Sequence, residues 1–92
     1  MKWDTEEEVI QRANSSKDGL GASVWSSDLA QADRISKQLQ AGTVWINSHM
    51  QLQPNATFGG HKQSGIGSEL GLEGLKSYCN VQTVYQQKAA KL

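Results

Sequence analysis

The chain has 92 residues, and its nine acidic and nine basic side chains give a formal net charge of zero. A chain of this length forms one small domain with a thin core, and its balanced charge gives no field that would attract nucleic acid or an anionic membrane. Its apolar runs are far shorter than a membrane span and its N-terminus is too acidic for a secretory signal, so we expect a cytoplasmic chain with no nucleic-acid and no membrane partner.

The first predicted element is a helix from about Glu6 to Asn14. Thr5, followed three residues later by Glu8, has the pattern of a capping box, which marks a helix start. A run of small and apolar residues, "LGASVW", then predicts a buried strand from about Leu20 to Trp25.

A second helix is predicted to open at Ser27 and Asp28, with one apolar side formed by Leu29, Ala32, Ile35 and Leu39. Gly42 stands where a left-handed C-terminal cap is expected. The next strand, "TVWIN", covers residues 43–47. A strand, helix and strand in this order normally form a crossover between parallel strands, so the fold class is predicted to be α/β.

A long stretch without regular structure is predicted for residues 48–65, and loops of this length are usually functional. A third helix is expected near Ser68 to Tyr78, and the alternating segment "NVQTVYQ" predicts a final strand at about Asn80 to Gln86.

The glycine-rich segment "FGGHKQSGIGSELG" raises two alternatives, a phosphate loop or a packed turn. Gly60 and Gly65 have the spacing of a P-loop, but Ile66 and Gly67 stand where its lysine and hydroxyl belong. The dinucleotide fingerprint fails as well, because Leu70 replaces its third glycine. We therefore favour glycines that permit tight turns and close packing.

Single-residue candidates for chemistry are few. Cys79 is the only cysteine, and we interpret it as a buried or half-buried bystander because neither histidine is placed beside it by sequence. His49 and His61 lack carboxylates at ligand spacing, so no metal site is predicted. Trp25 and Trp45 fall on predicted strands, where core packing is expected.

Taken together, these segments resemble the C-terminal part of the aldehyde dehydrogenase superfamily. The matching pieces, in family order, are "GLGASVWS", "AGTVWIN" and "FGGHKQSGIGSELGLEGL", and the resemblance covers about residues 4–86. It implies that residues 1–92 form a single partial domain. The end of the catalytic domain would be about residues 4–79, and a C-terminal oligomerisation strand would be about residues 80–87.

The resemblance also implies a chemistry. Members of the family oxidise an aldehyde to a carboxylic acid with NAD or NADP, using a cysteine nucleophile, a glutamate base and a hydride-accepting cofactor. None of the three has its family motif in this chain, since Glu69-Leu70-Gly71 only imitates the base motif. We therefore expect no catalytic residue, no cofactor bound by this chain alone and no activity of the isolated chain.

Three residues match substrate-binding positions of the family. Phe58 matches an aromatic that lines the aldehyde tunnel, with core packing as the alternative, and His49 and Leu52 belong to the variable loop at the tunnel's mouth. Two departures from the family pattern stand nearby, because Thr57 replaces a proline and Ser68 replaces an arginine that could form an ion pair.

Two function classes follow. The chain is either part of an aldehyde dehydrogenase, with an aldehyde as substrate only in the intact enzyme, or a truncated, non-catalytic binding or assembly module. Nucleotide binding by the glycine-rich segment is a weaker third class. The start at Met1-Lys2-Trp3, in place of the family's lead-in, favours a truncated product. In either class we expect self-association through unpaired strand edges.

Overall fold

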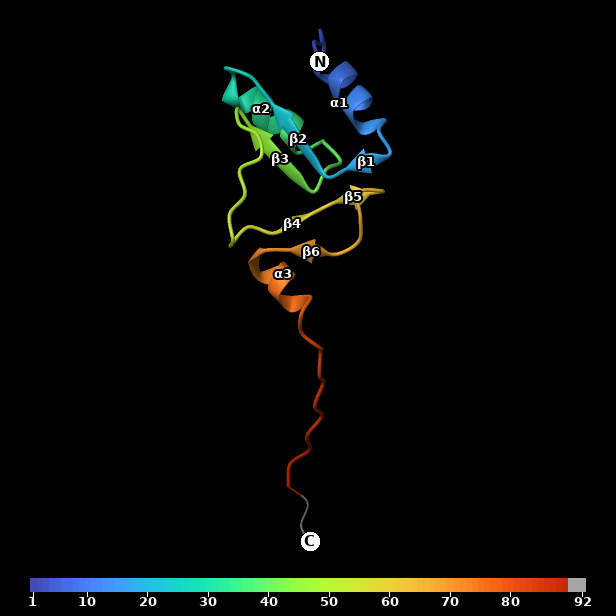
Figure 1. The fold of residues 1–92 in the computed structure, drawn as a ribbon, viewed down its shortest axis with the longest axis vertical. Helices are drawn as coiled ribbons and strands as arrows, with labels where there is room; N and C mark the ends of the chain where they lie inside the picture. The colour runs from blue at the N-terminus through green and yellow to red at the C-terminus, as the bar shows by residue number, and fades with distance from the viewer. Residues whose placement is uncertain (90–92) are drawn as a thin grey trace.

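The computed structural model describes residues 1–89 and divides into a folded part and an extended C-terminal segment (Figure 1). Its principal extents are 76 × 24 × 24 Å, because the chain after α3 runs away from the other elements. Within residues 1–89, no helix has the length and apolar character needed to cross a membrane. The elements in chain order are α1 (Glu6–Asn14), β1 (Asp18–Gly19), β2 (Gly21–Val24), α2 (Leu29–Ser36), β3 (Thr43–Ile46), β4 (Phe58–Gly59), β5 (His61–Lys62), β6 (Ser68–Glu69) and α3 (Gly71–Lys76).

Helix α1 has the predicted bounds, and its N-terminal cap explains why. The side-chain oxygen of Thr5 accepts a hydrogen bond from the backbone N–H of Glu8 at 3.2 Å. The Glu8 carboxylate reaches back to the backbone N–H of Asp4 at 3.4 Å, one residue earlier than in a standard capping box. The Thr5 contact satisfies an N–H group that a helix start leaves without an intrahelical acceptor, and the Glu8 contact ties the preceding residue to the first turn.

The predicted crossover β2-α2-β3 is confirmed, and its two strands are parallel. Residues 21–24 pair with residues 43–46 in sequence register. The Asp28 side chain caps α2 by accepting from the backbone N–H groups of Ala30 and Gln31 at 3.0 and 3.2 Å. Strand β2 is shorter than predicted, since Leu20 and Trp25 lie outside it.

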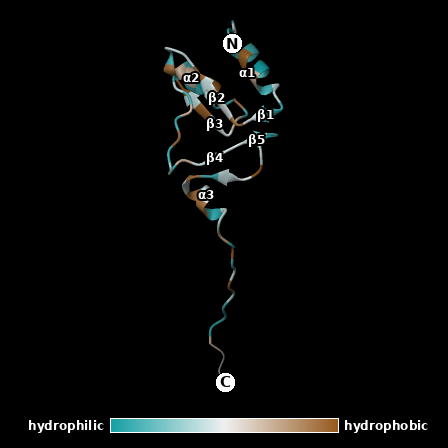
Figure 2. Ribbon diagram, viewed as in Figure 1, coloured by the Kyte–Doolittle hydropathy of each residue, from teal (hydrophilic) through white to brown (hydrophobic). Residues whose placement is uncertain are grey.

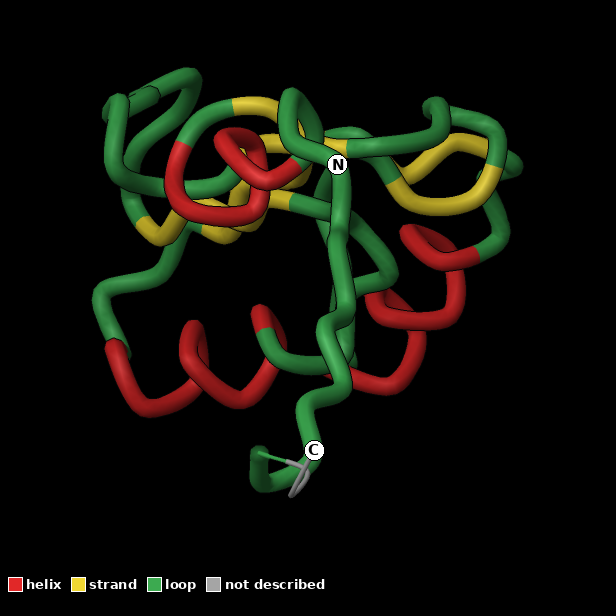
Figure 3. The backbone as a smooth tube through the Cα atoms, turned by 90° about the horizontal axis from the view of Figure 1, so that it is seen from below, coloured by secondary structure: helices red, strands yellow, loops and turns green. Residues whose placement is uncertain are grey.

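The core is small and lies between the helices and one face of the β2–β3 pair. Figure 2 shows apolar residues on the facing sides of these elements, and Figure 3 shows most of the helical turns on one side of the strands. The opposite face of β3 carries Trp45, which is buried. The core side chains are Val9, Val24, Ala32 and Ile35, with Trp3, Ile10, Leu39 and Val44 packed against them.

Three predicted core positions are wrong. Leu20, which lies just before β2, is 44% exposed. Trp25 is 65% exposed, because it follows the last paired residue of β2 and no element of residues 1–89 covers it. Leu29 is equally exposed at the first turn of α2, while Ala32 and Ile35 of the same predicted apolar side are buried. The buried stripe of α2 is therefore narrower than its sequence pattern.

Gly42 does not cap α2 as predicted. The helix ends at Ser36, with Lys37 in right-handed conformation at the C-cap, and Gly42 is not among the glycines of positive φ. A Cβ on Gly42 would overlap the backbone carbonyl of Gly59. The glycine is needed there because two backbone segments pass in direct contact.

The predicted irregular stretch contains short strands that the sequence did not reveal. Strand β5 pairs antiparallel with β1, and β4 pairs antiparallel with β6. Pairing of Ser68–Glu69 with β4 also explains why α3 begins at Gly71 rather than near Ser68. Between β6 and α3, Leu70 has φ 62° and ψ 165°, a conformation in which glycine is normally found.

The predicted final strand at residues 80–86 is not a strand in this structure. These residues carry no β pairing and lead away from the folded part as extended chain (Figure 1). A strand requires a neighbour for its backbone hydrogen bonds, and none of the described residues lies beside this segment. Cys79, at its start, is exposed rather than buried or half-buried.

Candidate functional site: the glycine-rich corner and the loop after β3

His49 lies in the loop that follows β3 and is held against the sheet. Its Nδ1 is 2.6 Å from the Ser23 hydroxyl of β2, and its ring meets Trp45 edge-on with centroids 5.2 Å apart. The imidazole remains exposed. The contacts therefore fix the orientation of a polar ring that solvent, or a ligand, can reach.

The same loop folds over Trp45. The indole N–H donates to the Gln51 carbonyl at 2.9 Å, so the loop backbone covers the buried ring. Leu52, the next residue, is 47% exposed. The two residues predicted at the tunnel mouth thus lie on the exposed side of an anchored loop.

Phe58 is half-buried at the start of β4, opposite Glu69 of β6. It borders a shallow hollow of about 290 Å³ together with Leu20 and residues of the glycine-rich segment. His49 and Leu52 do not line this hollow. The structure therefore places Phe58 apart from the other two predicted substrate-binding residues.

The glycines of this segment have two different roles. A Cβ on Gly59 would come within 2.9 Å of the Gly67 carbonyl oxygen, and one on Gly60 within 2.6 Å of the Ser64 Cβ. Gly65 and Gly67 instead have φ of 129° and 85°, with open space where a Cβ would be. Close packing at the first pair and tight turns at the second agree with the interpretation favoured from the sequence.

Three chain segments meet at what we call the glycine corner, defined as residues 14–19, 38–42 and 59–64. The Asn14 side chain donates to the Gln38 carbonyl and accepts from the Gln40 N–H, both at 2.8 Å. The Lys62 ammonium lies 2.8 Å from the Asn14 carbonyl oxygen. Sequence reasoning missed both residues, because no local pattern marks either of them.

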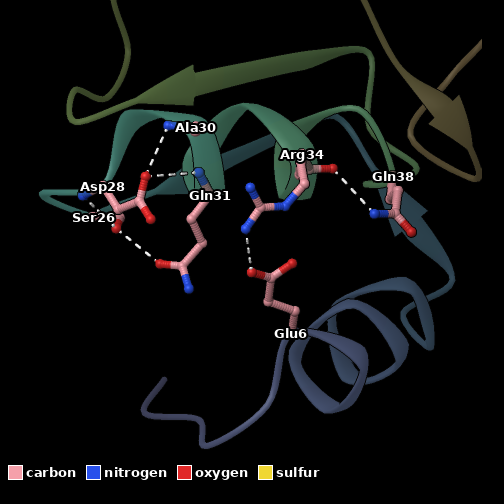
Figure 4. Close-up of polar contacts among 7 residues, drawn as sticks. All are labelled: Glu6, Ser26, Asp28, Ala30, Gln31, Arg34 and Gln38. Carbon is pink, nitrogen blue, oxygen red and sulfur yellow. Dashed lines mark hydrogen bonds and ion pairs between the residues drawn. The ribbon is translucent and has the colours of Figure 1, made fainter.

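An ion pair joins α1 and α2 at a place away from the glycine corner. Arg34 donates to the Glu6 carboxylate at 2.8 Å, as Figure 4 shows, together with the Asp28 cap of α2. The hydrogen bond from Arg34 lowers the pKa of Glu6, and the same bond raises the pKa of Arg34. Arg34 is exposed and Glu6 half-buried, and the pair orients α1 on α2 without adding charge to the glycine corner.

Possible catalytic groups are dispersed. In the part of the chain that the structure describes, no group of three or more His, Cys, Asp or Glu side chains could hold a metal ion. Within residues 1–89, the hydrogen-bond partner of the Cys79 thiol is the Leu75 carbonyl, at 3.5 Å. Glu69 lies on β6, where its backbone pairs with Phe58.

The parallel crossover and the glycine corner packed beside it define this chain as a segment of an α/β domain. The model of the aldehyde dehydrogenase family matches residues 1–84, and the chain belongs to this family.

Three similar proteins show how much of a family member the chain represents. It is 48% identical over 88 residues to the putative aldehyde dehydrogenase FUS7 of Gibberella fujikuroi, covering 96% of the chain and 19% of that protein. It is 51% identical over 84 residues to mitochondrial aldehyde dehydrogenase of Rattus norvegicus, covering 91% and 16%. A crystal structure of Staphylococcus aureus betaine aldehyde dehydrogenase with NAD⁺ superimposes with a TM-score of 0.80 at 50% identity, covering 83% and 15%. The chain thus spans less than a fifth of these relatives' length.

Proposed function

We propose that this chain is the C-terminal part of an aldehyde dehydrogenase, which oxidises an aldehyde to a carboxylic acid with NAD or NADP. The observation that supports this most strongly is the combined agreement in sequence and fold over most of the chain, at 50% identity and a TM-score of 0.80. In such an enzyme the segment contributes part of the substrate tunnel and an element of the oligomer. A cytoplasmic location belongs to the same proposal.

Phe58, His49 and Leu52 are the proposed substrate-binding residues. Phe58 offers a half-buried aromatic surface on a short strand. His49 offers an exposed ring, and its contacts with Ser23 and Trp45 fix the orientation of that ring. Leu52 adds an exposed aliphatic side chain on the same loop as His49. An aromatic wall with a small number of oriented polar groups is the usual composition of a site for a small organic substrate.

The isolated 92-residue chain is proposed to be inactive and to bind neither NAD nor NADP. Oxidation of an aldehyde in this family needs a thiolate to attack the carbonyl carbon, a base to activate water and a cofactor to accept hydride. Cys79 has no base or cation among its hydrogen-bond partners within residues 1–89. The missing groups must come from other parts of an intact enzyme.

The chain is also proposed to self-associate. Within residues 1–89, β2 and β3 pair only with each other, so each presents a free edge that another strand can join. The unpaired segment 80–86 exposes Val81, Val84 and Tyr85. These exposed apolar side chains also favour the second candidate function, a non-catalytic assembly module that keeps this end of the fold.

A segment exchange tests the enzymatic proposal. Residues 1–84 of this chain replace the matching segment of the S. aureus betaine aldehyde dehydrogenase, and NADH formation is measured with a panel of aldehydes. We expect a soluble enzyme that retains activity, and no NADH from the isolated chain at the same concentration. A folded hybrid that binds NAD⁺ but oxidises no aldehyde would contradict the proposal.

The native polypeptide's mass separates the two candidate functions. An antibody against this chain should detect a protein several times heavier than 10.1 kDa if the chain is part of an enzyme. A native product of 10.1 kDa would favour the assembly module.

A further inference from the structure

The backbone carbonyls at the C-terminal end of α1 accept hydrogen bonds from a side chain of the glycine-rich segment. The Lys62 Nζ lies 2.8 Å from the Asn14 carbonyl oxygen and 3.0 Å from that of Ser16. The last carbonyls of a helix lack intrahelical donors and carry partial negative charge, so a cation is favourable there. Hydrogen bonds with an ionised donor are stronger than neutral ones.

The backbone at Lys62 gives a second, independent observation. Its φ is 54°, in the left-handed region that favours glycine, although the same segment uses glycine at several other positions. A side chain in this conformation carries an energetic cost. The two contacts of the ammonium compensate for that cost, which explains why a lysine fits where backbone geometry alone favours glycine.

Neighbouring contacts extend this attachment along the segment. The Gln63 N–H donates to the Lys17 carbonyl at 3.1 Å, and the Gly19 N–H donates to the Ser64 hydroxyl at 2.7 Å. Strands β1 and β5 pair between these contacts. The whole stretch from residue 61 to residue 64 is therefore fastened to the turn that follows α1.

The attachment reaches Phe58 through the backbone. Gly59, its neighbour in β4, lies directly against Gly42, and the Gly42 N–H donates to the Gly19 carbonyl at 2.9 Å. Residues 59–64 are thus held at two places: Gly59 lies against Gly42, and Lys62 binds the carbonyl oxygens at the end of α1. A shift of β5 away from α1 would move the short strand that carries Phe58.

We propose that Lys62 is a positioning residue: its ammonium fastens the glycine-rich segment to the end of α1 and so fixes Phe58 in place. The consequence for substrate selection rests on the function proposed above, whereas the attachment itself does not. Lys62 is assigned no contact with substrate or cofactor.

Amide hydrogen exchange in the 92-residue chain, followed by NMR, tests the attachment. Lys62→Met removes the ammonium and keeps the aliphatic stem, Lys62→Gly also removes the backbone cost, and Lys62→Arg keeps a cation. Lys37→Ala is the matched control, because it removes another exposed lysine, one paired with Asp33 on α2.

We expect exchange at the Gln63 and Gly19 amides to accelerate about tenfold or more in Lys62→Met and Lys62→Gly. Lys62→Arg should restore part of the protection, and Lys37→Ala should match the wild type. Wild-type protection in Lys62→Gly would overturn the proposal, because backbone geometry would then suffice. If the variants do not fold, the wild-type chain is titrated with salt. Exchange at Gln63 should then accelerate relative to the β2–β3 amides, and an unchanged ratio would count against the proposal.

The hybrid enzyme tests the consequence for Phe58. Lys62→Met should change the ranking of aldehydes by kcat/KM in the same direction as Phe58→Ala, with a smaller amplitude, and Lys62→Arg should reverse part of the change. An unchanged ranking in Lys62→Met would overturn the positioning role. A hybrid without any dehydrogenase activity would contradict the proposed function, while the exchange rates would still decide the attachment.

Discussion

The glycine corner makes a sharp prediction for Gly42→Ala. Gly42 has no positive φ, so alanine can adopt its backbone conformation, and only the added methyl group matters. Its Cβ would overlap the Gly59 carbonyl oxygen and lie 2.7 Å from the carbonyl carbon. These are backbone atoms, which cannot turn away as a flexible side chain could.

The expected cost follows from overpacking. Inserting a methyl group into a closely packed site typically costs about 1–3 kcal/mol, and the gain of about 0.4–1 kcal/mol from restricting the unfolded chain offsets only part of it. A change of about 1 kcal/mol shifts Tm by roughly 4–8 °C in a domain of this size. We expect Gly42→Ala to lower Tm by about 5–15 °C, measured by thermal and urea unfolding followed by tryptophan fluorescence, to which the buried Trp45 contributes together with Trp3 and Trp25.

Gly67→Ala is the control for this prediction. Gly67 has φ 85° and open space at the Cβ position, so alanine there adds backbone strain without a collision. Both variants should be destabilised. Only Gly42→Ala should accelerate amide exchange at residue 42 relative to the other amides, because the N–H of this residue donates to the Gly19 carbonyl in the wild type. Wild-type stability of Gly42→Ala, or unchanged protection at residue 42, would refute the close contact with Gly59.

Three further predictions concern the caps, the helix pair and the strained turn. Asp28→Ala should destabilise the chain by about 1 kcal/mol in urea unfolding, because two N–H groups of α2 lose their acceptor, and no change would show that the cap is dispensable. Because Arg34 lowers the pKa of Glu6, the stability difference between wild type and Glu6→Gln should be small but present above pH 4.5 and should vanish as the pH falls further. A pH-independent difference in urea midpoints would contradict this reasoning. Leu70→Gly should raise Tm, because it relieves a backbone conformation that costs about 1–3 kcal/mol, and a Tm at or below that of the wild type would contradict this reasoning.

The crossover could be predicted because its signals are local. Thr5 and Asp28 mark both helix starts within a few residues, and the structure shows both side chains in those caps. A strand, a helix and a strand separated by short connections then leave little choice but a parallel pair. The sequence therefore sufficed for the order of α1, β2, α2 and β3 and for the parallel pairing of the two strands.

The errors have non-local causes. Trp25 reads as a strand residue, but its burial depends on an element that does not lie over it among residues 1–89. Gly42 reads as a helix cap, but its neighbour is Gly59, 17 positions further along the chain. Residues 80–86 have a strand pattern, and a pattern cannot supply the pairing partner.

The candidate site was predictable only in part, for the same reason. The resemblance to the family supplied Phe58, His49 and Leu52, while residue patterns alone gave no role to any of them. Lys62 and Asn14 escaped notice because the bond between them joins positions 48 residues apart. A lysine that binds carbonyl oxygens at the end of a helix far away in the sequence leaves no pattern in the residues around it.

The glycine corner also explains why the segment resembles a phosphate loop and differs from one. A phosphate loop leaves successive backbone N–H groups free to point at an anion. Here the protein itself occupies such donors of the segment: the Gln63 N–H binds the Lys17 carbonyl at 3.1 Å, the Ser64 N–H binds the His61 carbonyl at 3.1 Å, and the Gly71 N–H at the start of α3 binds the Pro54 carbonyl at 2.8 Å. The lysine is occupied as well, by two carbonyl oxygens beyond α1 and at its end. Glycines that let backbones approach this closely place donors against acceptors of the same chain, which supports the proposal that the segment holds Phe58 in place and gives no support to a phosphate loop.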